Sequence, residues 1–399
     1  MVVEASGPSA KEPRGARALA AGAAFVVALL TKLPQLGFTH KEPDEVIYWQ
    51  LAQRLWQDGA YSLRGTRVLE RLPASMYDHA LFHHPPLFAA LLGPWAANSA
   101  ALLPPAGALW VTFLAHAIFA AAVAATGLRL AQRAGGTASV GVALAAGAAA
   151  ALDPFGWFAA RFLWIDAVSM ACAAVAAWCA LGRTGRGWFV GAGVACGLAL
   201  LAKLTGGVVL LALVFERLAR RDGRAGRARD LAALVLPAAL MAGAWLAVFA
   251  AHTGALLPTW IAPDDGVLAR DALMRAGFER SPLAYAWLVV LVQPLVVWTA
   301  LALWRRRDDA HLVALTVWYL GGGALIAATS LLGTTPVLTR QLAPVQAALY
   351  IAAIALFVRL DDARWRAAFG VCVAVAAAGA WRDVHGTSVY ELRGLAGWF

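Results

Sequence analysis

The chain has 399 residues, of which 61% are hydrophobic and 14% charged, and its formal net charge at pH 7 is +10. Its mean hydropathy of +0.67 excludes a soluble globular or an intrinsically disordered protein, because neither can accommodate so much apolar surface. Apolar runs long enough to cross a bilayer, which takes about 20 helical residues, recur along the whole length. The composition therefore predicts an all-α polytopic membrane protein.

About eleven spanning helices are expected, within a range of about ten to thirteen because several apolar runs are short. The first run lacks a signal-peptide cleavage site, so we expect a retained first span after a cytoplasmic N-terminus. The four cysteines lie inside apolar runs at spacings that predict neither a disulfide nor a metal framework. The expected spans are 16–36, 106–128, 137–154, 162–181, 187–202, 204–216, 231–251, 284–303, 310–333, 341–357 and 367–381.

Arginine and lysine are concentrated in a few short polar segments, which the positive-inside rule predicts to be cytoplasmic. The rest of the chain carries balanced charges, so the basic excess follows from topology and no nucleic-acid partner is expected. A functional site on the face opposite these basic segments would then face the exterior or periplasm of a plasma (inner) membrane. The basic segments are the N-terminus, 129–136, 182–187, 216–230, 304–309 and 358–366.

The segment PPLFAALLGPWAA at 85–97 would reverse the side of every later basic segment if it crossed, and it is too short to span comfortably. We expect an interfacial or re-entrant helix there, which makes residues 37–105 one large external loop and 252–284 a second. Residues 1–382 are expected to form one transmembrane domain, followed by a short external tail at 383–399.

The first external loop opens with HKEPDEVIYW at 40–49, where charges crowd the exit of the first span. Its continuation places apolar residues on one helical face and glutamines largely on the other, which predicts an amphipathic helix in the membrane surface. Asp44 and Glu45 fall in its first turn. Two interpretations remain open: ordinary acidic residues that complement the helix dipole, or a functional carboxylate pair.

Other ionisable residues are expected on the same outer face. Asp153, Arg161 and Asp166 surround the junction of two spans, and Lys203 and Arg340 each lie at the outer end of a span. Such groups are costly at membrane depth and tend to face a cavity or one another. As an alternative, Arg161 snorkels and Asp166 pairs with it as a structural clamp.

The sequence FHHPPLF at 82–88 holds His83 and His84 directly before a short helix whose entry is fixed by two prolines. These imidazoles could donate to a phosphate, bind a metal or lie at the interface. In a later span, Gly193 and Gly197 form a GxxxG pair, which indicates only close helix packing.

These short motifs occur in the order seen in the GT-C glycosyltransferases. Over roughly residues 16–360 the chain resembles two groups of that superfamily. These are the dolichyl-phosphate-mannose protein mannosyltransferases and the aminoarabinose transferases that modify lipid A. The matching motifs are the acidic pair Asp44–Glu45, HPPL at 84–87, R(x)4D at 161–166, GLALLAK at 197–203 and R(x)3P at 340–344.

The resemblance implies an enzyme that transfers a sugar from a polyprenyl-phosphate carrier to a lipid, glycan or protein acceptor, with inversion in a single displacement. It implies Asp44 as general base, and Glu45 and Asp166 as residues that orient the acceptor or share that role. It also implies that four further side chains contact the donor phosphate as cations. These are His84, Lys203, Arg340 and Arg161.

No cofactor is required by this chemistry, although a divalent metal on Asp44, Glu45 and His83 is an option. The chain departs from the aminoarabinose transferases, which have an acidic-basic pair where His83 and His84 stand, and from the protein mannosyltransferases, which have a large lumenal insertion. The alternatives are a multispan transporter or flippase for a lipid-linked or small anionic substrate, and a non-catalytic membrane subunit.

Overall fold

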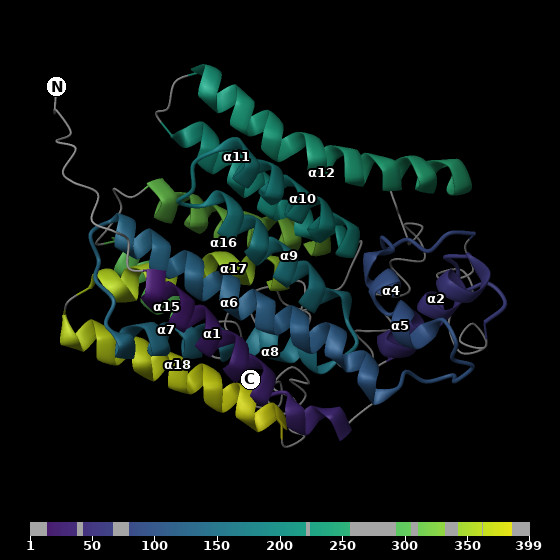
Figure 1. Ribbon diagram of the computed structural model, residues 1–399, viewed down its shortest axis with the longest axis horizontal. Helices are drawn as coiled ribbons and strands as arrows, with labels where there is room; N and C mark the ends of the chain where they lie inside the picture. Colours follow the sequence, from purple (N-terminus) through teal and green to yellow (C-terminus); the bar gives the residue numbers. More distant parts are fainter. Residues whose placement is uncertain are drawn as a thin grey trace.

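The structure is a computed structural model that describes residues 14–37, 43–66, 80–220, 224–255, 293–304, 310–331, 342–360 and 362–384. Within these ranges the regular elements are all helices, so the predicted all-α class is confirmed (Figure 1). In chain order they are α1 (Arg14–Leu30), η1 (Leu33–Gly37), α2 (Pro43–Asp58), α4 (Leu87–Leu91), α5 (Gly93–Ala96), η3 (Ala106–Leu109), α6 (Trp110–Arg133), α7 (Val140–Ala151), α8 (Pro154–Arg161), α9 (Ile165–Ala180), α10 (Arg186–Ala202), η4 (Leu204–Gly207), α11 (Val208–Ala219), α12 (Arg224–Thr253), α15 (Leu295–Trp304), α16 (Ala310–Leu331), α17 (Ala343–Arg359) and α18 (Ala363–Val384).

Each expected span overlaps at least one of these helices within the described residues, although 284–292 of the span 284–303 lie outside them. Three are long and apolar enough to cross a membrane unaided, namely Gly15–Leu36, Ala106–Arg133 and Gly226–Thr253. α7 and α8 form a further candidate as a pair bent by 48°. The shorter apolar helices include α9, α10, α15 and α17. The expected count of eleven spans stays a prediction.

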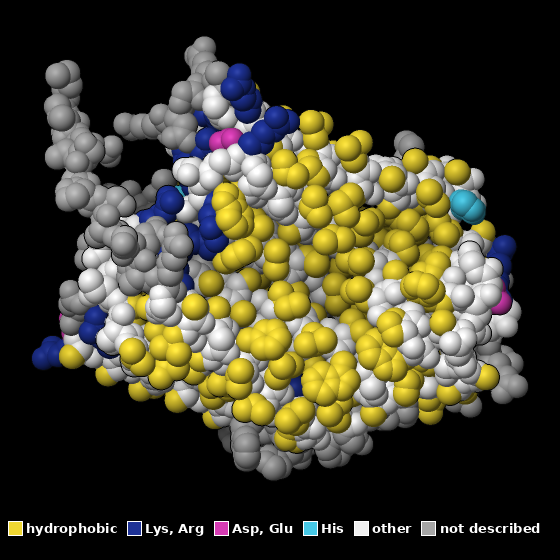
Figure 2. Space-filling view, in the orientation of Figure 1, with side chains coloured by type: hydrophobic (Ala, Val, Ile, Leu, Met, Phe, Trp, Pro, Cys, Tyr) yellow, Lys and Arg dark blue, Asp and Glu magenta, His cyan; other side chains and the backbone are white. Residues whose placement is uncertain are grey.

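Small residues allow the helices of the bundle to pack closely, as is usual where lipid surrounds the protein. α6 lies at the centre and packs against α1, α9 and α17, and Gly127 of α6 lies directly against Ile354 of α17. α10 packs along α12, where Gly193 faces the Leu234 carbonyl and Gly197 faces Met241. The close packing predicted from the GxxxG pair is therefore confirmed. The face of the bundle that Figure 2 shows is largely apolar.

The segment 85–97 forms two short helices, α4 and α5, neither of which is long enough to cross a bilayer. They lie beside α2 at one end of the bundle, which we call the site end (Figure 1). Gly93 of α5 lies against the indole of Trp56, where a larger side chain would collide.

α2 is covered on both sides, unlike the membrane-surface helix that the sequence predicts. Its apolar side buries Leu51, but Trp49 is fully buried as well, and its Nε1 donates to the Ala101 carbonyl at 2.9 Å. Gln53 Nε2 donates to the Ser99 carbonyl at 2.7 Å and to the Ala101 carbonyl at 2.9 Å. Of the glutamines on this face, Gln53 is buried, and its amide is satisfied by the backbone that follows α5.

Asp153 lies at the break between α7 and α8, in the stretch that joins the expected spans 137–154 and 162–181, and the outer position of that junction stays a prediction. It is the N-cap of α8, and its Oδ2 accepts a hydrogen bond from Gly156 N–H at 2.9 Å. Pro154 occupies the first turn, where a missing N–H has no cost. The bend thus follows from a helix start built into the middle of an apolar run.

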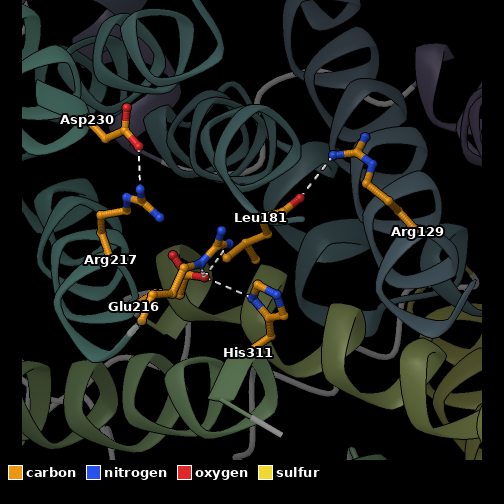
Figure 3. Close-up of polar contacts among 7 residues, drawn as sticks. Arg129, Leu181, Glu216, Arg217, Asp230 and His311 are labelled. Atoms are coloured by element: carbon orange, nitrogen blue, oxygen red, sulfur yellow. Dashed lines mark hydrogen bonds and ion pairs between the residues drawn. The ribbon is translucent and has the colours of Figure 1, made fainter. Parts of the chain in front are cut away.

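The end of the bundle opposite α2 and α4 is rich in arginine, and we call it the arginine end. There Arg220 pairs with Glu216 at 2.6 Å, His311 Nδ1 lies 2.9 Å from the same carboxylate, and Arg217 pairs with Asp230 at 2.5 Å (Figure 3). These ion pairs join α11 to α12 and α16. The positive-inside rule predicts this end to be cytoplasmic.

Candidate functional site

The acidic pair of α2 is tied to the backbone between α8 and α9. Asp44 and Glu45 occupy the first turn of α2, where carboxylates complement the helix dipole. Glu45 is 2% exposed, and its Oε1 accepts a hydrogen bond from the Leu163 N–H at 3.0 Å. Asp44 is half-buried at the adjacent position. The buried Glu45 carboxylate therefore holds α2 against the segment between Arg161 and Asp166.

Asp166 and Lys203 form a nearly buried ion pair within this region. Asp166 lies in the first turn of α9, Lys203 is the C-cap of α10, and Lys203 Nζ donates to Asp166 Oδ1 at 2.6 Å. Asp166 thus pairs with Lys203 instead of Arg161, the partner considered from sequence. The pair places a cation and a carboxylate side by side three residues after Leu163.

Arg161 is the last residue of α8, and this short helix is held firmly at both ends. Asp153 caps its start, while near its end Thr112 Oγ1 donates to the Ala160 carbonyl at 2.9 Å and the buried Lys32 donates to the Trp157 carbonyl. The Arg161 side chain is buried, and its guanidinium lies 5.5 Å from the Phe162 ring centroid. The cation is therefore fixed at the site end.

The rings of His83 and His84 pack against each other at a tilt directly before α4, with ring centroids 4.3 Å apart. The His84 ring lies 6.1 Å from that of Tyr48, which is one turn after Glu45 on α2. Tyr61 Oη donates to the Pro85 carbonyl at 3.2 Å and secures the same segment. His83 is buried and His84 is half-buried, so His84 is the better placed of the two to contact a ligand.

A divalent metal on Asp44, Glu45 and His83 stays a prediction, although the three side chains are not grouped around one point. Within the described part of the chain, no three His, Cys, Asp or Glu side chains are grouped so that they could hold a metal ion, and Asp44, Glu45 and His83 are no exception. Glu45 is moreover committed to the Leu163 N–H. No step of the reaction proposed below uses a metal.

The structure brings Asp44, Glu45, Arg161, Asp166, Lys203, His83 and His84 to the site end, whereas Arg340 lies outside the described residues. Two contributors were missed from sequence. One is the Leu163 N–H, because a backbone donor has no residue signature. The other is Ser169, which lies one turn after Asp166, is buried and faces Gly206 of η4. The sequence did offer a signal for Ser169, because it places a hydroxyl group in an otherwise apolar span.

Comparison with known proteins points to one enzyme class. A family model described as glycosyltransferase family 87 matches residues 82–328. No curated protein matches the sequence.

Solved structures of ArnT from Cupriavidus metallidurans match the fold with a TM-score of 0.60 in the apo state and 0.58 bound to undecaprenyl phosphate, at 20% and 21% identity. Both alignments cover 90% of this chain, which spans 63% and 64% of the length of those proteins. An oligosaccharyltransferase from Archaeoglobus fulgidus also matches, with a TM-score of 0.49 and 14% identity over 94% of this chain and 56% of that one.

Proposed function

Because the chain belongs to glycosyltransferase family 87, we propose that it transfers a sugar from a polyprenyl-phosphate donor to an acceptor at the site end of the bundle. The observation that carries this proposal is the arrangement at that end. A carboxylate, Asp44, stands beside Glu45, whose bond to the Leu163 N–H holds it next to the Asp166–Lys203 pair. The site end then faces the exterior or periplasm of the plasma (inner) membrane, in line with the arginine distribution.

Asp44 is the general base in this reaction. Its half-buried carboxylate accepts the proton of the acceptor hydroxyl as that oxygen attacks the anomeric carbon. Glu45 has a different role, since its oxygen already accepts the Leu163 N–H, and it positions the start of α2. Asp166, paired with Lys203, orients that lysine and the acceptor side of the site.

The departing group is a phosphate, so the enzyme must stabilise negative charge that grows on its oxygens. Lys203 and Arg161 supply cations at the site end, and His84 supplies an imidazole before α4. Arg340, beyond the described residues, stays a predicted phosphate contact. The bond to phosphate breaks as the bond to the acceptor oxygen forms, which inverts the anomeric carbon.

Support for a polyprenyl tail comes from the surroundings of the site. The elements around it expose large apolar side chains, such as Leu91 of α4 and Leu204 of η4, on which a hydrocarbon chain can lie without exposure to water. One of the matching ArnT structures is bound to undecaprenyl phosphate, a lipid of this class. The acceptor, whether lipid, glycan or protein, is expected to be compact or to be presented by a partner.

The donor class is tested with the purified protein in liposomes, supplied with membrane-extract acceptors and radiolabelled sugars on polyprenyl phosphate or on nucleotides. We expect label to move to an acceptor only from the polyprenyl-phosphate sugars. Transfer from nucleotide sugars alone would refute the proposal. Movement of an intact substrate across sealed vesicles without transfer would favour the transporter alternative.

A further inference from the structure

The end of α8 lies a few residues from the groups proposed for catalysis. Arg161 is its last residue, and only residues 162–164 separate it from α9, which carries Asp166 in its first turn. The Leu163 N–H that donates to Glu45 belongs to this short link. Because all eight residues of α8 are buried, its position depends on the neighbouring helices. Any contact that fixes the end of α8 therefore also fixes these site groups.

The last carbonyls of a buried helix need donors from outside the helix. At Ala160 the regular pattern is broken, because the Trp164 N–H, which would reach this carbonyl in a continuing helix, donates to the Phe162 carbonyl at 2.9 Å. The Ala160 carbonyl instead lies 2.9 Å from Oγ1 of Thr112, in the first turn of α6. The same hydroxyl lies 3.0 Å from the Leu109 carbonyl. Thr112 is 0% exposed, so α6 supplies a buried donor to the end of α8.

A buried lysine supplies the second donor to α8. Lys32 lies just after α1, is 0% exposed, and its Nζ donates to the Trp157 carbonyl. The same Nζ lies 3.8 Å from the centroid of the Trp157 ring, so the ammonium contacts both the backbone and the indole of one residue. Burying an ammonium is costly, and contacts of this kind offset that cost. Lys32 thus ties the end of α1 to α8.

The stretch from α8 to α9 holds the chain on both sides of the entry to α2. Lys32 contacts this stretch before the entry, and the acidic pair contacts it in the first turn of α2, through the bond to the Leu163 N–H. A shift of α8 would move Arg161 and, through Leu163, the acidic pair, whereas Lys203 is carried by α10. We propose that Lys32 and Thr112 are positioning residues, which hold the end of α8 so that Arg161 and the acidic pair keep their places relative to Lys203. This inference rests on the proposed sugar transfer.

A purely structural role for the two contacts makes a different kinetic prediction. If they only stabilised the fold, their loss would lower the amount of folded enzyme but leave the KM for the donor unchanged, because KM does not depend on enzyme concentration. Misplaced site groups instead weaken binding of the donor or slow the transfer step. The KM for the polyprenyl-phosphate sugar, measured in liposomes well below the unfolding temperature, therefore separates the two roles.

Substitutions of Thr112 give the main test, because they keep the volume of the side chain nearly constant. Thr112→Val removes the hydroxyl, and we expect it to raise the KM for the donor about fivefold, the ratio that corresponds to one lost hydrogen bond. Thr112→Ser keeps the hydroxyl and is expected to keep KM within about twofold of wild type. Lys32→Met removes the ammonium and is expected to act as Thr112→Val does. An unchanged KM in both Thr112→Val and Lys32→Met would overturn the proposal.

Gln35→Met is the matched control for Lys32→Met. Gln35 lies in η1, close to Lys32 in sequence, and is likewise 0% exposed. Its side-chain amide makes no hydrogen bond within the part of the chain that the structure describes. The substitution is expected to leave KM nearly unchanged. Equal rises in KM from Gln35→Met and Lys32→Met would show a general disturbance of this turn and contradict the role of Lys32.

Amide hydrogen exchange at Leu163 gives a readout that does not depend on activity. We expect faster exchange of the Leu163 N–H in Thr112→Val and Lys32→Met than in wild type, Thr112→Ser and Gln35→Met. If the wild type transfers no sugar, the proposed function fails, and the exchange rates still decide whether the two contacts hold α8. Wild-type exchange at Leu163 in both variants would contradict the inference.

Discussion

Two neighbouring carboxylates of α2 have different surroundings, and this separates their roles. Glu45 is buried and bonded to the Leu163 N–H, a partner 118 residues away in sequence, whereas Asp44 is half-buried. We therefore assign a positioning role to Glu45, which is bonded to a backbone donor, and propose proton transfer for Asp44, the more exposed of the two. The resemblance assigned the base to Asp44 and left Glu45 to orient the acceptor or share that role, but the bond to the Leu163 amide could not be predicted because a backbone donor leaves no mark in the residue pattern.

Substitutions of Glu45 test its positioning role. Glu45→Gln keeps an oxygen that accepts the Leu163 N–H, so the variant is expected to fold and to retain most of its sugar transfer. Glu45→Ala leaves that buried N–H without an acceptor and is expected to cost about 1–3 kcal/mol of unfolding free energy, with transfer lost. Thermal unfolding and transfer rates measure both effects. Complete loss of transfer in a well-folded Glu45→Gln protein would instead assign Glu45 to the chemistry.

The Asp166–Lys203 pair can be tested by a double-mutant cycle. Lys203→Met alone leaves a nearly buried carboxylate uncompensated and is expected to destabilise the protein by about 3–5 kcal/mol. Adding Asp166→Asn should recover much of that loss, whereas simple additivity would contradict the pairing. If Lys203 also contacts the donor phosphate, the folded double variant stays inactive. Restored transfer would show that the pair is structural only.

At the scale of elements, the apolar runs predicted the helices well, because a span of suitable length has few other structures available in lipid. The break at Asp153 was not predicted. An Asp-Pro step within an apolar run is a recognisable helix start, but the hydrogen bonds that hold α8, from Lys32 and Thr112, come from distant helices. Similarly, the hydrogen bonds of Gln53 and Gln57 on α2 were not predicted, since their backbone acceptors lie 39 to 48 positions away in sequence.

The contact between α10 and α12 gives a test at this scale. Gly193→Ala places a methyl group against the Leu234 carbonyl and is expected to destabilise the protein by about 1–3 kcal/mol. Gly243→Ala, on α12 with nothing within 4 Å of its Cβ position, is the matched control. It is expected to be neutral or to stabilise the helix by roughly 0.5–1 kcal/mol. Equal effects of the two substitutions on thermal unfolding would contradict the close packing of α10 on α12.

At the scale of the whole molecule, polar chemistry is divided between the two ends of an apolar bundle. The site end carries the acidic pair, the Asp166–Lys203 pair and the histidines, and the arginine end carries the ion pairs of Glu216 and Arg217. Sequence predicted this division from the distribution of basic residues. It could not predict which charges pair, because those contacts depend on how the helices pack.

The orientation of the two ends is tested by cysteine labelling with an impermeant reagent in intact cells. Asn98 at the site end and Thr184 at the arginine end are both exposed. Asn98→Cys is expected to be labelled from outside, and Thr184→Cys only after the membrane is permeabilised. Labelling of both from outside would contradict the predicted topology.

The central claim is that Asp44 acts as the base in sugar transfer from a polyprenyl-phosphate donor. The most direct measurement compares initial transfer rates of wild type, Asp44→Asn and Asp58→Asn in liposomes. Asp58 is a matched control on the same helix, half-exposed and paired with Arg54 at 2.7 Å. We expect Asp44→Asn to lose roughly 10²–10⁴-fold in rate while remaining folded, and Asp58→Asn to transfer sugar at nearly the wild-type rate. An undiminished rate in Asp44→Asn would contradict the account.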